Sequence, residues 1–127
     1  IINVGSVAGL MPGGPYMATY YATKSYVVSL TNALAEELKL LGSHAQVHAL
    51  CPGPVNTEFN DVANVKFSLK GISARECVSY CIDEADKGKI IIVPNMMVKA
   101  AAIASKFVPR EIVLGIVARS QKSKIER

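Results

Sequence analysis

The sequence is poor in the residues from which disulfide frameworks and metal sites are built. It has three cysteines and two histidines, and three thiols cannot all pair. No CxxC spacing is present. Cys77 and Cys81 would share one helix face, but His44 and His48 belong to a different segment. We therefore expect no metal site, and we expect the cysteines, Cys51 included, to be free thiols buried in a reducing, cytoplasmic environment.

Charge is also scarce. Charged residues make up 19% of the 127 residues and hydrophobic residues 50%, which is typical of one well-packed globular domain and not of a disordered chain. No signal peptide, internal repeat or low-complexity stretch is visible. The apolar run over 96–117 is interrupted by charged residues and by Pro109, so it predicts no membrane span.

The beginning of the chain lacks the features of a natural terminus. It has no initiator methionine and opens directly on an apolar run, residues 1–4, whereas natural termini are usually polar and frayed. We therefore expect a fragment. Residues 1–127 would be the C-terminal part of a single domain, with a helical tail over 96–127.

The positive charge is concentrated at the other end. The formal net charge is +4, and the last stretch carries Arg119, Lys122, Lys124 and Arg127. A solvated terminal helix is the simplest explanation, and contact with nucleic acid or an anionic membrane is the alternative. No aromatic residues alternate with these cations, so we expect no nucleic-acid partner.

Alternation of strands and helices predicts the fold. Apolar runs at 1–4, 46–50 and 90–93 read as strands. A Gly- and Pro-rich loop over 9–15 is followed by a helix over 16–41, on which Tyr20, Val27, Leu30, Leu34 and Leu38 recur at helical spacing; Gly42 ends this helix. Ser73 and Glu76 form a capping box that opens another helix, to about Ala85. Residues 56–72 read as irregular, and two helical segments separated at Pro109 close the chain. This order predicts an α/β doubly wound parallel sheet covered on both faces.

One pair of side chains on the first helix has catalytic potential. Tyr20 and Lys24 are four residues apart, so they share a helix face. A nearby cation favours phenolate and brings a tyrosine toward the range in which general acid–base catalysis works. An exposed lysine beside a packed tyrosine is the alternative. Position favours the catalytic interpretation, because Ser6 and the Pro52-Gly53 turn follow two neighbouring strands, and ligand clefts form outside the carboxyl ends of parallel strands.

The motifs resemble one family in particular. The strings 3–9 (NVGSVAG), 20–24 (YYATK) and 50–57 (LCPGPVNT) are similar, in order and nearly in spacing, to the second half of the short-chain dehydrogenase/reductase family, and the likeness runs from residue 1 to about 93. The resemblance implies a Rossmann-like fold whose N-terminal strands are missing from this chain. It also implies a hydride transfer between a cofactor, NADP or NAD, and a carbonyl or alcohol substrate.

The resemblance also assigns roles to residues. It implies that Ser6 hydrogen-bonds the substrate carbonyl, that Tyr20 donates or accepts the proton, and that Lys24 binds the nicotinamide ribose and tunes Tyr20. A segment lining the nicotinamide would contribute further cofactor contacts, from Pro52, Gly53, Val55 and Thr57. The gap from Ser6 to Tyr20 is one residue longer than the commonest family spacing, and the family's phosphate-binding turn belongs to the absent half.

The distribution of apolar residues indicates which partners the protein has. Apolar residues in 58–71, namely Phe59, Val62, Val65, Phe67 and Leu69, suggest an apolar wall for a small-molecule substrate, with core packing as the alternative. The helix over 16–41 is apolar over a wide arc, which predicts a homodimer or homotetramer through this helix. A nonenzymatic binding or regulatory module with the same fold is the rival function, and we expect the fragment alone to be inactive.

Overall fold

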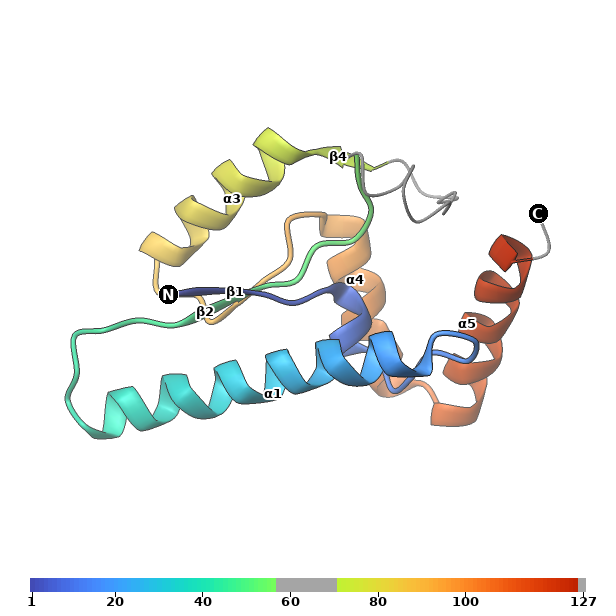
Figure 1. Ribbon diagram of the computed structural model, residues 1–127, viewed down its shortest axis with the longest axis horizontal. Coiled ribbons are helices and arrows are strands. Elements are labelled where there is room, and N and C mark those ends of the chain that lie inside the picture. The colour runs from blue at the N-terminus through green and yellow to red at the C-terminus, as the bar shows by residue number, and fades with distance from the viewer. Residues whose placement is uncertain (57–70, 126–127) are drawn as a thin grey trace.

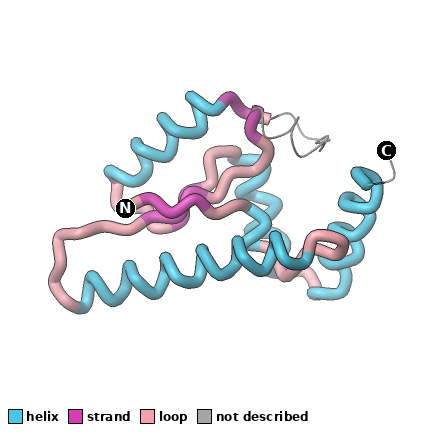
Figure 2. Tube along the Cα trace, viewed as in Figure 1, coloured by secondary structure: helices cyan, strands magenta, loops and turns pink. Residues whose placement is uncertain are grey.

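The computed structural model describes residues 1–56 and 71–125, with side chains up to residue 122. The strands are β1 (Ile2–Val4), β2 (His48–Leu50), β3 (Val55–Asn56), β4 (Ile72–Ser73) and β5 (Ile91–Ile92). The helices are α1 (Ala18–Leu40), α3 (Ala74–Asp86), α4 (Met96–Ala104) and α5 (Arg110–Ile125), with short 3₁₀ helices η1 (Val7–Leu10) and η2 (Ser105–Phe107). Figure 2 shows how these elements are distributed along the chain.

The main sheet has three parallel strands in the order β1-β2-β5, as the alternating pattern predicts. Helix α1 runs along one side of the strands and α3 lies on the other (Figure 1). Successive strand residues serve the two faces. Ala49 packs with Val28 of α1 and Val98 of α4, while Leu50 packs with Cys77 and other residues of α3. The sheet is therefore covered on both faces, which confirms the predicted fold class.

Both sequence-predicted helix boundary signals have the expected geometry. Ser73 and Glu76 form a complete capping box at the start of α3. At the end of α1, Gly42 has a φ of 64°. The N–H groups of Gly42 and Ser43 donate to the carbonyls of Lys39 and Leu38 at 3.0 and 2.9 Å. This is the Schellman arrangement, which favours glycine because a Cβ is disfavoured at positive φ.

Three details differ from the sequence predictions. Residues expected in the 9–15 loop take part in η1, whose N-cap is Ser6. Helix α1 begins at Ala18 and not at Tyr16, because Tyr16 has a left-handed φ of 68°. The stretch expected to be irregular over 56–72 is bounded by a parallel pair, in which β3 meets β4.

The residues that recur at helical spacing in α1 are not the ones that this helix buries. The buried residues of this helix are Tyr21, Val28 and Thr31, whereas Tyr20, Leu30 and Leu34 of the expected apolar stripe are 36–39% exposed. Thr31 faces the sheet because its hydroxyl accepts a hydrogen bond from Asn3 Nδ2 of β1 at 3.0 Å and donates to the Val27 carbonyl at 2.8 Å. A small, satisfied polar residue thus shares the core-facing side with Tyr21 and Val28, while the apolar side chains of Leu30 and Leu34 are exposed.

The three cysteines are free and buried, as expected. In the part of the chain that the structure describes, no His, Cys, Asp and Glu side chains gather in a group able to hold a metal ion. No helix among these residues is long and apolar enough to cross a membrane.

Candidate active site

Ser6 is held by the backbone on both sides. The N–H of Gly5 donates to the Leu50 carbonyl at 2.8 Å, and the N–H of Val7 donates to the Pro52 carbonyl at 3.0 Å. These two bonds continue the β1–β2 pairing past the ends of the strands. They bring the loop after β1 beside the loop after β2, as the strand-end argument predicts.

The Ser6 hydroxyl has a fixed direction. Its Oγ accepts a hydrogen bond from the Ala8 N–H at 3.2 Å, which makes Ser6 the N-cap of η1 and leaves the side chain 7% exposed. A hydroxyl has one donor and two acceptor positions. The proton of Ser6 Oγ therefore remains able to donate to a bound carbonyl oxygen.

Lys24 and Tyr20 lie together on α1. The Lys24 Nζ is over the Tyr20 ring, 5.8 Å from its centroid, within the range of a cation–π contact. The same ammonium donates to the Val4 carbonyl at the end of β1, at 3.1 Å. Lys24 therefore connects the tyrosine on the helix with the strand end that leads into Ser6.

Tyr21, which follows Tyr20 in the sequence, has a different environment from Tyr20. Tyr20 is 37% exposed, whereas Tyr21 is 9% exposed, and its hydroxyl accepts a hydrogen bond from Gln121 Nε2 at 2.9 Å. Burial is the main cause that raises the pKa of Tyr21, and the bond from Gln121 only partly opposes it. Tyr21 is thus a buried neutral phenol, and Tyr20 is the one that solvent or a ligand can reach.

Close backbone contacts fix the loop between Ser6 and α1. A Cβ added to Gly9 would lie 2.4 Å from the Lys24 carbonyl oxygen, and one added to Gly14 would lie 2.2 Å from the Tyr21 ring. Only glycine allows approaches this close. The sequence marks these residues as loop formers but gives no sign of what they touch.

Cys51 lines the same region, although the sequence identifies it only as a free thiol. It is fully buried directly after β2, and a Cβ on Gly5 would lie 3.0 Å from its Sγ. Burial raises the pKa of Cys51 to about 11, while a backbone hydrogen bond from Ser6 and the charge of Lys24 act in the opposite direction. At neutral pH the thiol is therefore protonated and unreactive.

Besides Tyr20 and Lys24, the predicted cofactor-binding residues come from the 52–57 segment and divide into three groups. The Pro52 carbonyl accepts from the Val7 N–H beside Ser6, and the next residue, Gly53, lies close to Val98 of α4. Val55 packs against the core cluster around Leu50 and Ile92. Thr57 and the apolar wall expected over 58–70 lie outside the described residues.

This arrangement defines an α/β protein with a strand-end site, and comparison with known proteins identifies the family. A family model described as short chain dehydrogenase matches residues 1–66. The chain is 51% identical over 55 residues to the inactive 2-(S)-hydroxypropyl-CoM dehydrogenase 2 of Xanthobacter autotrophicus, covering 43% of this chain and 23% of that protein. It is 42% identical over 57 residues to human 15-hydroxyprostaglandin dehydrogenase [NAD(+)], covering 45% and 21%.

Structural comparison agrees. A short-chain dehydrogenase from Sphingobium yanoikuyae, solved in complex with NADPH, superposes with a TM-score of 0.65 and 27% identity, covering 88% of this chain and 43% of that one. The chain belongs to the short-chain dehydrogenase family, and its fold is the Rossmann-like fold of that family. It spans less than half the length of each of these three proteins.

Proposed function

We propose that the protein to which this chain belongs is an oxidoreductase that moves a hydride between NAD(P)(H) and a carbonyl or alcohol, with Tyr20 as proton donor or acceptor. One observation carries this proposal. The Lys24 ammonium lies over the Tyr20 ring and is anchored at the end of β1, two residues before Ser6. Family membership supplies the reaction class.

The residues present fit a nicotinamide cofactor at this edge of the sheet. An ammonium has three N–H donors, so the bond from Lys24 to the Val4 carbonyl leaves donors for ribose hydroxyls. A bound nicotinamide cofactor supplies or takes up the hydride. Cofactor contacts at Pro52, Gly53, Val55 and Thr57 are part of the proposal, as is either form of the cofactor, NADP or NAD.

Ser6, Tyr20 and Lys24 have separate roles in the carbonyl reduction that we propose. The Ser6 hydroxyl donates to the substrate oxygen and orients it. Tyr20, the exposed phenol, transfers its proton to that oxygen as negative charge develops there. Lys24 holds the ribose and favours the phenolate that remains. In the direction of alcohol oxidation the proton moves back to Tyr20.

The test is Tyr20→Phe in the full-length protein, with NAD(P)H oxidation followed against a panel of ketones and aldehydes. Turnover should fall by about 100-fold or more, because general acid catalysis contributes at least that factor, while cofactor affinity stays within a few fold. Tyr26→Phe is the matched control, since Tyr26 lies on the same helix and is 66% exposed. Retention of more than about a tenth of the activity would contradict the assignment of Tyr20.

A nonenzymatic binding module is the second candidate. The observation that favours it is that one matched relative is named an inactive dehydrogenase. Such a module would bind NAD(P)H, and Lys24→Ala would weaken that binding. A binding module would reduce none of the ketones and aldehydes in the panel, with or without the Tyr20→Phe substitution.

We also propose that the parent protein is a homodimer or homotetramer that associates through α1. The outward face of this helix carries apolar side chains with 36–80% exposure, namely Tyr26, Leu30, Leu34 and Leu41. Exposed apolar surface of this kind marks an association site or a surface covered by the rest of the same protein. Sedimentation at micromolar concentration separates these outcomes.

A further inference from the structure

The first turn of α1, which carries Tyr20, has no side-chain cap. The N-cap residue is Met17, which makes no side-chain hydrogen bond to the helix. Tyr16 before it has a left-handed φ of 68°. A helix N-terminus leaves its first N–H groups without intrahelical partners, and an uncapped end tends to fray. Tyr20 is the third residue of this helix, so its position depends on whatever else holds the turn.

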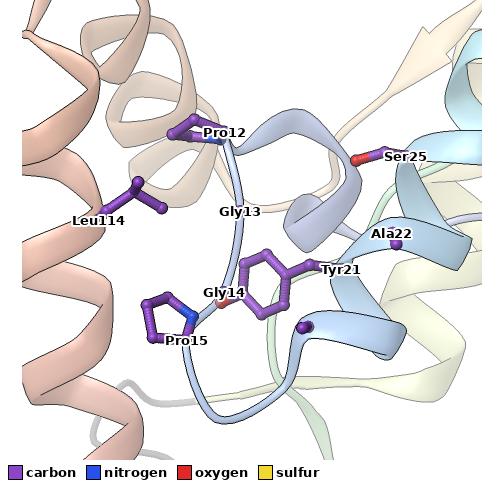
Figure 3. Close-up of a pocket in the computed structure, with 9 residues that line it drawn as sticks. Pro12, Gly13, Gly14, Pro15, Tyr21, Ala22, Ser25 and Leu114 are labelled. Carbon is purple, nitrogen blue, oxygen red and sulfur yellow. The ribbon is translucent and has the colours of Figure 1, made fainter.

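Tyr21 holds the turn from the opposite side. Its N–H donates to the Met17 carbonyl at 3.1 Å, and its ring points toward the loop and lies against Gly14 (Figure 3). Its hydroxyl is bound by Gln121 of α5, 100 residues away in sequence. Both side chains are buried, with Tyr21 9% and Gln121 6% exposed.

Helix α5 is attached to the first turn by an apolar cluster as well. Val113 and Val117 of α5 pack with Tyr21 and with Ala8 of η1. In Figure 1, α5 stands beside the start of α1, well away from the strands. The hydrogen bond from Gln121 is thus the directional part of a contact whose remainder is apolar and non-directional.

Tyr21 in turn limits the position of Tyr20. The two rings meet edge to face, with their centroids 6.2 Å apart and their planes at 74°, a favourable aromatic geometry. The Lys24 ammonium occupies a second side of the Tyr20 ring. An altered Tyr21 ring would therefore shift the Tyr20 phenol relative to Ser6, which the backbone holds independently.

We infer that Gln121 is a positioning residue for catalysis: by fixing the Tyr21 hydroxyl, it holds the first turn of α1 and keeps the Tyr20 phenol in place beside Tyr21 and Lys24. This inference rests on the proposed role of Tyr20. Through this one hydrogen bond, α5 supports the active site. Catalytic geometry is sensitive to such support, since a misplacement of about 1 Å can reduce a rate by about 100-fold.

The test compares Gln121→Met with Val117→Ala in the full-length protein. Methionine keeps the length and approximate volume of glutamine but removes the donor to Tyr21. Val117→Ala removes buried methyl groups from the same cluster and leaves the hydrogen bond in place, so it is the matched control for a loss of packing. We expect Gln121→Met to lower kcat by about fivefold with unchanged cofactor affinity, and Val117→Ala to lower Tm without lowering kcat.

Tyr21→Phe completes a double-mutant cycle. It removes the other partner of the same bond while keeping the ring that contacts Tyr20. If the bond acts as a unit, the double variant loses no more kcat than either single variant. Multiplied losses, an unchanged kcat in Gln121→Met, or an equal loss in Val117→Ala would each overturn the inference.

Hydrogen exchange tests the same inference without relying on turnover. Backbone amides in residues 18–24 should exchange faster in Gln121→Met than in the wild type, and less so in Val117→Ala. Unchanged exchange in Gln121→Met would overturn the inference. A Tyr20→Phe variant that keeps its activity would instead overturn the proposed function, and the exchange result would still report whether Gln121 holds the turn.

Discussion

Gly9 is the residue at which a single methyl group should disturb both the fold and the site. An added Cβ would lie 2.4 Å from the Lys24 carbonyl oxygen, 2.6 Å from the carbonyl carbon and 3.0 Å from Val28 Cγ2. Van der Waals contact between carbon and oxygen needs about 3.3 Å, so η1 and α1 would have to separate by about 1 Å. Backbone atoms of a helix cannot rotate away as a side chain would.

Gly9→Ala should lower the free energy of unfolding by about 1–3 kcal/mol, because the added methyl group overpacks the contact between η1 and α1. In a domain of about 150–250 residues, each kcal/mol lowers Tm by about 2–4 °C. The rate should fall further than the stability suggests, because the Gly9 N–H donates to the Ser6 carbonyl at 3.0 Å. Moving η1 away from α1 therefore moves Ser6 relative to Lys24 and Tyr20.

Thermal unfolding and steady-state kinetics on Gly9→Ala and Gly115→Ala provide the assay. Gly115 lies in α5, and an added Cβ there meets nothing within 4 Å, so alanine should stabilise the helix by about 0.5–1 kcal/mol. Opposite shifts in Tm for the two variants are the expected result. A Gly9→Ala protein with wild-type Tm and kcat would refute the close approach of η1 to α1.

Three further predictions concern single side chains. Lys24→Ala should weaken NAD(P)H binding by about 10-fold or more, since a hydrogen bond to a charged group contributes about 1.5–3 kcal/mol; unchanged affinity in a calorimetric titration would contradict its role. Hydrogen bonds from Lys87 and Lys89 lower the pKa of Glu84 from 4.5 to about 2, so this carboxylate stabilises the fold above pH 4.5 and loses that contribution as the pH falls toward 2. Unfolding curves of wild type and Glu84→Gln should therefore differ at pH 7 and converge in acid. Leu30→Glu, on the outward face of α1, should convert the proposed oligomer to monomers in sedimentation, and an unchanged assembly would place the interface elsewhere.

The parallel sheet and the convergence of the loops could be predicted from the sequence because both follow from local patterns. Short apolar runs that end in glycine or proline identify strands and mark their carboxyl ends. The capping box at Ser73 and the terminating Gly42 locate two helix ends in the same way. The bonds from Gly5 to Leu50 and from Val7 to Pro52 are what two adjacent parallel strands would form just beyond their ends.

The orientation of α1 could not be predicted because it depends on a partner distant in sequence. Thr31 is buried through its bond with Asn3, and a ranking by hydrophobicity places threonine on the solvent side. Tyr20, Leu30 and Leu34 look like a core stripe only when the helix is considered alone. For the same reason no local pattern connects Tyr21 with Gln121, which are 100 residues apart.

Ser6 and Tyr20 are held in place by different kinds of interaction. Ser6 is fixed by backbone bonds that continue the sheet pairing, so truncation of a neighbouring side chain should leave it in place. Tyr20 is fixed by the side chains of Lys24, Tyr21 and, through Tyr21, Gln121. Loss of the Gln121 bond should therefore affect the proton transfer proposed for Tyr20 more than the substrate orientation proposed for Ser6. A solvent isotope effect on kcat that grows in Gln121→Met but not in Val117→Ala would be the kinetic sign of this asymmetry, and equal effects in both variants would argue against it.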